Sequence, residues 1–152
     1  MSMSERDELR KKVFMKIAID VSVLNTCLKN GVGAVLVKDK RIIATGYNGA
    51  PAGVSHCTHC LRQEGKMTRG MGSDLCRANH SELNAILNAA KFGVRTDGAD
   101  LYVTIFPCTA CAKALKNAGI KKIYFMEGTI AIITKKMLVE AGITWEKVKM
   151  DE

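Results

Sequence analysis

The sequence lacks any apolar run close to the roughly 18 residues that a membrane-spanning helix needs. Its first twelve residues, MSMSERDELRKK, are strongly charged and contain no apolar stretch of the kind found in secretory signals. These two absences predict a protein that is neither membrane-embedded nor exported, and we expect a cytoplasmic location. With 152 residues, of which 47% are hydrophobic, the chain is expected to form a single domain, 1–152, around one core.

Aromatic residues are also scarce. They make up only 5% of the chain, which leaves few side chains on which the bases of a nucleic acid could stack. The net charge of +8 favours an anionic partner, either a phosphate-bearing metabolite or a nucleic acid, but scattered basic residues are equally consistent with an ordinary basic surface. We therefore expect a small nucleotide partner rather than a nucleic acid.

The pattern of apolar residues and turn signals predicts an α/β fold. Helices are expected at residues 5–29, 80–92, 108–118 and 130–141, and strands at 32–38, 41–47, 100–105, 122–126 and 144–149. In the first helix, Val13, Ile17, Val21, Leu24 and Leu28 form an apolar stripe. The first two strands form a hairpin at Asp39-Lys40, and the later alternation of strand and helix predicts parallel pairing. The expected architecture is a five-stranded mixed sheet with helices on both faces.

The residues that indicate a chemical function form a motif in two separate parts. His80-Ser81-Glu82 is followed, 25 residues after Glu82, by Pro107-Cys108-Thr109-Ala110-Cys111. This H-x-E…P-C-x-x-C pattern is typical of zinc nucleobase deaminases. It supplies three ligands and leaves a fourth position open for water, whereas a structural zinc site is closed by four protein ligands.

Each half of the motif opens a predicted helix. Cys108 and Cys111 are three residues apart in a first turn, where the helix dipole favours thiolates. We therefore predict His80, Cys108 and Cys111 as ligands of a catalytic Zn²⁺ and Glu82 as the carboxylate that moves protons. A lone C-x-x-C is often structural or redox-active, and a lone histidine is usually just polar, but the two halves together favour catalysis.

The other four cysteines lie outside that motif. Cys57, Cys60 and Cys76 belong to a long irregular segment, residues 48–79, with Cys76 just before His80, and Cys27 ends the first predicted helix. Four thiolates could close a tetrahedral structural zinc, and a long segment with little apolar content needs such a link. His56 or His59 could replace one cysteine. The alternative is four separate thiols, and we favour the second zinc.

These motifs resemble the deoxycytidylate (dCMP) deaminase family of the bacterial and phage type, over about residues 27–142. The match includes HSELNAI at 80–86, and its more specific parts are GYNGAPAG at 46–53 and FPCTACAK at 106–113. The resemblance implies a three-layer αβα cytidine-deaminase-like fold, and hydrolysis of dCMP to dUMP and ammonia for thymidylate synthesis. It assigns zinc binding to His80, Cys108 and Cys111 and proton transfer to Glu82. Ser81 stands where the family usually has alanine.

The resemblance also implies ligand contacts and regulation. Asn48 is the expected substrate contact, in a turn whose residues Tyr47, Gly49 and Ala50 could also bind substrate or effector. Regulated relatives are activated by dCTP and inhibited by dTTP, usually with Mg²⁺ and as hexamers. Some phage relatives have a second zinc whose ligands match Cys27 and Cys57. Arg77 is a candidate phosphate contact by position and charge, with a surface salt bridge as the equal alternative.

Two other classes of function remain as alternatives. One is a deaminase acting on a related substrate, such as dCTP, a modified dCMP or a base within nucleic acid. The other is a non-catalytic zinc module that binds DNA or a protein. The scarcity of aromatics argues against a nucleic-acid substrate, and the presence of Glu82 beside an open zinc position argues against a non-catalytic module.

Overall fold

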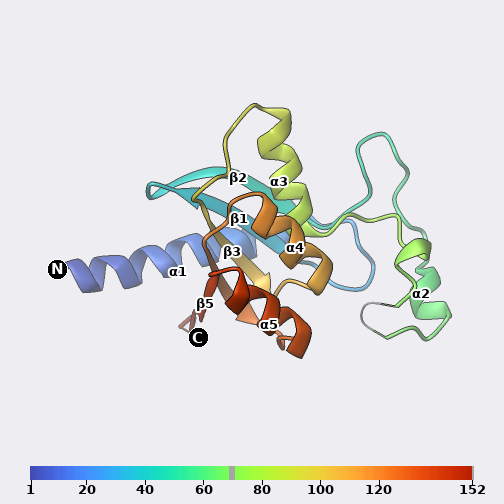
Figure 1. The fold of residues 1–152 in the computed structure, drawn as a ribbon. Coiled ribbons are helices and arrows are strands. Elements are labelled where there is room, and N and C mark those ends of the chain that lie inside the picture. The colour runs from blue at the N-terminus through green and yellow to red at the C-terminus, as the bar shows by residue number, and fades with distance from the viewer. Residues whose placement is uncertain (69–70, 152) are drawn as a thin grey trace.

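The computed structural model describes residues 1–68 and 71–151, and its centre is a five-stranded mixed sheet (Figure 1). The strands are β1 (Gly33–Lys38), β2 (Arg41–Tyr47), β3 (Asp100–Ile105), β4 (Lys122–Glu127) and β5 (Thr144–Lys147), in the spatial order β2-β1-β3-β4-β5. The β1 strand pairs antiparallel with β2 and β3, and β3, β4 and β5 run parallel. The predicted mixed sheet, and the hairpin at Asp39-Lys40, are confirmed.

One helix covers one face of this sheet. It is α1 (Met3–Ser22), and a capping box at its start pairs Ser2 with Glu5 in both directions. Met15 and Ala18 are fully buried against Val35 and Tyr102 of the sheet. The helix spans fewer residues than the predicted 5–29.

The predicted apolar stripe of this first helix is wrong in its details. Val13, Leu24 and Leu28 are exposed, and the last two lie beyond the end of the helix. The stripe treated residues 5–29 as one continuous helix. The chain instead leaves the helix at Val23, which sets Leu24 and Leu28 outside the helical register.

Three helices cover the opposite face: α3 (Ser81–Lys91), α4 (Thr109–Asn117) and α5 (Ile132–Glu140). Because side chains of a strand alternate between faces, Leu36 and Leu101 point into this layer while Val35 and Tyr102 point toward α1. Ala85, Leu115 and Leu138 complete the layer's core. Helices on both faces of the sheet give the expected three-layer αβα arrangement.

The segment between β2 and α3 projects from this body (Figure 1). It contains one short helix, α2 (Leu61–Glu64), and a single 3₁₀ turn at Ser73–Leu75, and its described residues contribute no buried hydrophobic side chain. The irregular character predicted for residues 48–79 is confirmed for the described part. No described helix combines the length and the apolar character that crossing a bilayer requires.

Candidate metal centre and neighbouring cavities

Three side chains that the sequence places far apart meet at one point. His80 Nδ1 lies 3.4 Å from Cys111 Sγ and 3.5 Å from Cys108 Sγ. Within the described part of the chain, these three residues are the only group of three or more potential ligands whose donor atoms all lie within 4.8 Å of one another. We call His80, Cys108 and Cys111 the metal centre.

Helix starts position all three ligands. His80 is the residue that precedes the first turn of α3, Cys108 precedes the first turn of α4, and Cys111 lies within that turn. Pro107 links the end of β3 to α4, so the site sits beyond the carboxyl end of a parallel strand, where α/β proteins commonly build their sites. The two helix dipoles add partial positive charge where the thiolates gather.

Strand β2 fixes the position of α3, and therefore of His80. A Cβ at Gly46 would overlap the Ser81 carbonyl oxygen and the Ala85 nitrogen, so only glycine permits this close packing. The amides of Asn84 and Asn88 donate to the carbonyls of Tyr47 and Thr45, both at 2.8 Å. The helix start that carries His80 is thus held by backbone contact and by two hydrogen bonds.

Hydrogen bonding within the metal centre separates the pKa values of its two thiols. The Cys111 thiol donates to Cys108, which lowers the pKa of Cys108 to about 3 and raises the pKa of Cys111. The hydrogen bond to Cys108 also raises the pKa of His80, against the effect of burial. Without a metal, the second thiol therefore keeps its proton.

Glu82 lies beside this cluster and is 5% exposed. Burial raises the pKa of its carboxyl, while a backbone hydrogen bond and the nearby His80 oppose that rise. The Ser81 hydroxyl, which is fully buried, donates to Glu82 Oε2 at 3.2 Å. This hydrogen bond fixes one carboxylate oxygen, and apart from the identity of Ser81 no sequence pattern predicted it.

The donor set fits zinc. Two sulfurs and one imidazole nitrogen are zinc's usual ligands, and three of them leave the fourth position open. Bringing a second thiolate next to the first is unfavourable without a cation, and a divalent ion at this point would replace the Cys111 proton. The trio is a His/Cys/Cys zinc site of the kind that catalytic zinc enzymes use.

The turn after β2 is tied to neighbouring segments through Asn48. Its side-chain oxygen accepts from the Val32 N–H at 2.8 Å and its amide donates to the Asn30 carbonyl at 2.6 Å. Asn48 is 8% exposed, so the residue predicted to contact substrate holds two backbone segments together in this structure. Its side-chain amide keeps one N–H and one oxygen lone pair that these two hydrogen bonds do not use.

The next residues of this turn also make backbone contacts. Gly49 exchanges two backbone hydrogen bonds with Asn79, the residue before His80, and the Ala50 N–H donates to the Thr26 hydroxyl. Tyr47 is 39% exposed. The turn is therefore joined to the segment that leads into the metal centre, and its ligand contacts stay predictions.

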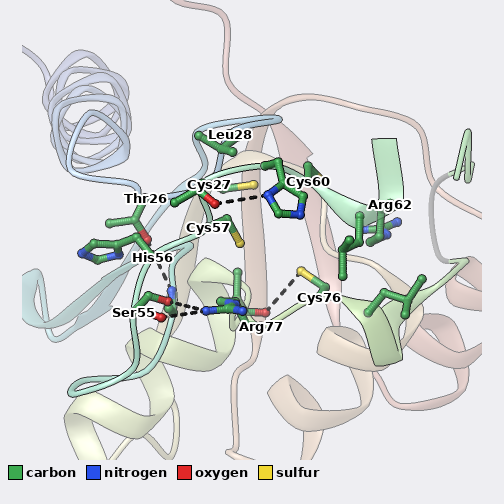
Figure 2. A pocket seen from close by; sticks show the side chains of 16 residues that line it. Thr26, Cys27, Leu28, Ser55, His56, Cys57, Cys60, Arg62, Cys76 and Arg77 are labelled. Atoms are coloured by element: carbon green, nitrogen blue, oxygen red, sulfur yellow. Dashed lines mark hydrogen bonds between the residues drawn. The ribbon is translucent and has the colours of Figure 1, made fainter. Parts of the chain in front are cut away.

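The remaining cysteines line a separate cavity of about 310 Å³, which we call the cysteine cavity (Figure 2). Its wall contains all four thiols of the predicted second zinc site, and also both candidate replacement histidines: Cys27, Cys57, Cys60, Cys76, His56 and His59. Among the described residues, however, these groups do not gather as tightly as the metal centre does. The sequence therefore identified residues that share a cavity, not a formed set of ligands.

Arg77 also belongs to the cysteine cavity. Its Nη1 donates to the Ser55 carbonyl oxygen at 3.0 Å and to the Ser55 hydroxyl at 2.9 Å, as the dashed lines in Figure 2 show. The salt bridge considered for Arg77 is absent among the described residues, and its phosphate contact stays a prediction. The guanidinium instead ties two parts of the projecting segment together.

A second hollow, of about 490 Å³, includes Cys108 of the metal centre in its wall. We call it the α4–α5 depression, because Cys108, Thr109 and Lys113 of the α4 region and Thr134 of α5 line it. The Thr109 and Thr134 hydroxyls share a 2.7 Å hydrogen bond that joins the two helix starts. Sequence reasoning missed this depression, since its lining comes from two helices and the loop between β4 and α5.

The chain matches one protein-family model over most of its length. The model described as "Cytidine and deoxycytidylate deaminase zinc-binding region" matches residues 9–127. This range contains the metal centre, Glu82 and the whole projecting segment. It ends where β4 ends, so α5 and β5 lie outside the match.

Individual relatives agree with this match. ComE operon protein 2 of Bacillus subtilis is 43% identical over 141 residues, covering 91% of this chain and 71% of the relative. Deoxycytidylate deaminase of Enterobacteria phage T4 is 35% identical over 151 residues, covering 78% of each. The crystal structure of dCMP deaminase from the cyanophage S-TIM5 in complex with dCMP and dUMP is 30% identical, with a TM-score of 0.75 and coverage of 97% and 98%.

Proposed function

Because this chain belongs to the cytidine and deoxycytidylate deaminase family, we propose that it catalyses the hydrolytic deamination of dCMP to dUMP and ammonia. The observation that carries the proposal is the convergence of His80, Cys108 and Cys111 beside the buried carboxyl of Glu82. Deoxycytidylate deaminases among its relatives, and a solved relative that binds dCMP and dUMP, support the choice of substrate. The dUMP formed would supply thymidylate synthesis, in the cytoplasm, from a single catalytic domain.

The metal centre would hold zinc through His80 Nδ1, Cys108 Sγ and Cys111 Sγ. When bound, zinc supplies a Lewis acid that activates a water molecule for attack on the carbon that bears the amine. Two thiolates neutralise the charge of the ion, so the water is activated less than it would be by an all-histidine site. A protein base is therefore needed, and Glu82 is the buried carboxyl beside the centre.

Glu82 performs the proton transfers in this proposal. Its carboxylate accepts a proton from the attacking water as the C–O bond forms, and passes that proton to the ring nitrogen. Glu82 then takes the second proton of the added hydroxyl and delivers it to the amine, the C–N bond breaks, and ammonia leaves. Burial raises the pKa of the Glu82 carboxyl, which brings it closer to the working pH of a group that must both accept and release a proton.

The turn after β2 and Arg77 complete the proposed ligand contacts. Asn48 retains one N–H and one lone pair toward a substrate, and the backbone of Tyr47, Gly49 and Ala50 could contact substrate or effector. Arg77 lies at the cysteine cavity, so we assign it to an effector phosphate rather than to the substrate. Activation by dCTP, inhibition by dTTP, bound Mg²⁺ and a hexamer belong to the same proposal.

A second, structural zinc at the cysteine cavity is part of the proposal as well. Cys27, Cys57, Cys60 and Cys76 share one cavity wall, and movement of the loops that carry them would bring them into a tetrahedral set. Such a zinc would stabilise a segment that has little apolar burial of its own. Elemental analysis should then give two zinc ions per chain.

The proposal is tested by measuring ammonia release from dCMP, dCTP, cytidine and a single-stranded oligonucleotide, each with and without dCTP or dTTP as effector. We expect dCMP to be the preferred substrate, with dUMP as the product. Glu82→Gln should retain zinc and lose roughly 10²- to 10⁴-fold in kcat. Turnover of dCTP or of the oligonucleotide in preference to dCMP would support the alternative substrates, and full activity of Glu82→Gln would remove its assigned role.

A further inference from the structure

The α4–α5 depression contains one charged side chain among its described lining residues, the ammonium group of Lys113. Lys113 is exposed, and within the described parts of the chain it forms neither a hydrogen bond nor an ion pair. A lone, unneutralised cation in the wall of a hollow is positioned to bind an anion.

The depression shares one residue with the metal centre, because Cys108 lines it. Lys113 lies one helical turn beyond Thr109, and long side chains on a helix lean back toward its N-terminus. The Lys113 side chain therefore leans in the direction of Cys108. If an anionic group at one end of a substrate binds Lys113, the other end of that substrate could lie at the metal centre.

The remaining lining of the depression suits the polar part of a nucleotide. Apart from Pro107 and Cys108, it consists of threonine hydroxyls and small side chains, from Thr109, Ala110, Thr129, Ala131 and Thr134. No aspartate or glutamate of the described residues lines it, and the thiolate of Cys108 in its wall would be neutralised when the metal centre holds zinc. The residues that precede α4 and α5, Cys108 and Ala131, make no side-chain capping bond, and the partial positive charge of both helix starts adds to that of Lys113.

We propose that Lys113 binds the 5′-phosphate of the substrate and so makes this enzyme specific for a nucleoside monophosphate over the free nucleoside. The inference rests on the proposed deaminase function, which places the amine-bearing ring at the metal centre. A lysine ammonium is a point charge that binds phosphate without demanding a fixed geometry. Arg77 is the competing candidate, but it lines the cysteine cavity and its Nη1 is engaged by Ser55.

The test compares dCMP with deoxycytidine in Lys113→Gln. A charge-assisted hydrogen bond contributes enough that the ratio of kcat/KM for dCMP to kcat/KM for deoxycytidine should fall roughly ten- to a hundredfold, mainly through the KM for dCMP. Lys113→Arg should restore most of that ratio. Lys136→Gln, which removes the same charge from an exposed position of α5 outside the depression, should leave the ratio at its wild-type value.

Two outcomes would overturn the role of Lys113. One is an equal loss on both substrates, which would mean that the change disturbs α4 rather than phosphate binding. The other is a ratio that falls in Arg77→Gln and not in Lys113→Gln.

Calorimetric binding of dUMP and deoxyuridine separates this proposal from the proposed function. Wild-type protein that binds dUMP more tightly than deoxyuridine, with the preference lost in Lys113→Gln, supports the phosphate contact even if dCMP is not turned over. Equal binding of the two ligands by the wild type would exclude it. Absence of ammonia release from dCMP by the zinc-loaded wild type would refute the proposed function itself.

Discussion

The metal centre and the cysteine cavity draw on the same two residue types, cysteine and histidine, but they hold them on different kinds of backbone. The ligands of the metal centre begin two helices that pack on the sheet, and Cys111 is 6% exposed. The thiols of the cysteine cavity lie on loops or beside the short α2 helix, and all of them are half-buried. The first set is gathered within hydrogen-bonding distance, whereas the second shares only a cavity wall.

The two regions differ in the interactions that hold their cysteines and histidines in place. At the metal centre, the buried core and the close contact at Gly46 determine where the ligands lie, so the arrangement exists before a metal binds. At the cysteine cavity, no described apolar core fixes the loops, and a metal would have to organise them as it binds. We expect the two regions to respond very differently to the loss of one ligand.

The largest expected effect follows from Cys111→Ala. Removing one of three ligands should release zinc from the metal centre and reduce deamination of dCMP by at least roughly 10³-fold, since both the Lewis acid and the activated water are lost. The fold should survive, because alanine fits the first turn of α4 and Ala112 and Leu115 still fill the core. Zinc content by elemental analysis and ammonia release measure the two losses.

The matched change at the cysteine cavity is Cys60→Ala. It should lower the zinc content by one ion, make the projecting segment more sensitive to limited proteolysis, and leave kcat for dCMP within a few-fold of the wild type. If Cys60→Ala instead abolished activity and Cys111→Ala did not, the assignment of the two regions would be reversed. Unchanged zinc content in Cys60→Ala would remove Cys60 from the second site.

A smaller effect is expected where the sheet positions α3. In Gly46→Ala, the new methyl group would meet the backbone of Ser81 and Ala85, which cannot rotate away as a side chain can. Overpacking of this kind costs about 1–3 kcal/mol of unfolding free energy, and the forced shift of α3 should also weaken zinc binding. Chemical denaturation and competition with a chelator report the two consequences.

The projecting segment supplies the control for that prediction. At Gly65 the φ angle is −76°, and an added Cβ would lie 3.3 Å from its nearest neighbours, one of which is the flexible end of Met67. Gly65→Ala should therefore change the free energy of unfolding by less than about 0.5 kcal/mol. Equal destabilisation by the two substitutions would argue against the close packing of β2 and α3.

Much of the fold and of the metal centre could be predicted from the sequence, because the relevant signals are local. Alternating apolar residues and glycine stops located all five strands and the helices α3, α4 and α5 to within a few residues. The metal centre was predicted correctly because each half of its motif opens a helix. A helix start fixes side-chain direction, so two short motifs were enough to place three ligands.

The features that were missed depend on where separate segments pack. The α4–α5 depression requires knowing how two helix starts face each other, and the pairing of Arg77 with Ser55 joins residues 22 apart in an irregular segment. The first helix was predicted too long, because the apolar spacing of Leu24 and Leu28 continues past Val23, where the chain turns away. Periodicity alone does not report such an end when neither glycine nor proline marks it.

The smallest expected effect compares two serine hydroxyls, one in each region. Ser81→Ala removes the donor to Glu82 Oε2 and should lower kcat for dCMP by roughly two- to tenfold, the size of one net hydrogen bond. Because that bond lowers the pKa of Glu82, its removal should raise the pKa, so the acidic limb of the kcat profile should move to higher pH. Ser55→Ala removes only the hydroxyl acceptor of Arg77 at the cysteine cavity and should leave the profile unchanged. A profile that stays fixed in Ser81→Ala, or one that moves in Ser55→Ala, would show that the Ser81 hydroxyl does not act on the proton-transfer step.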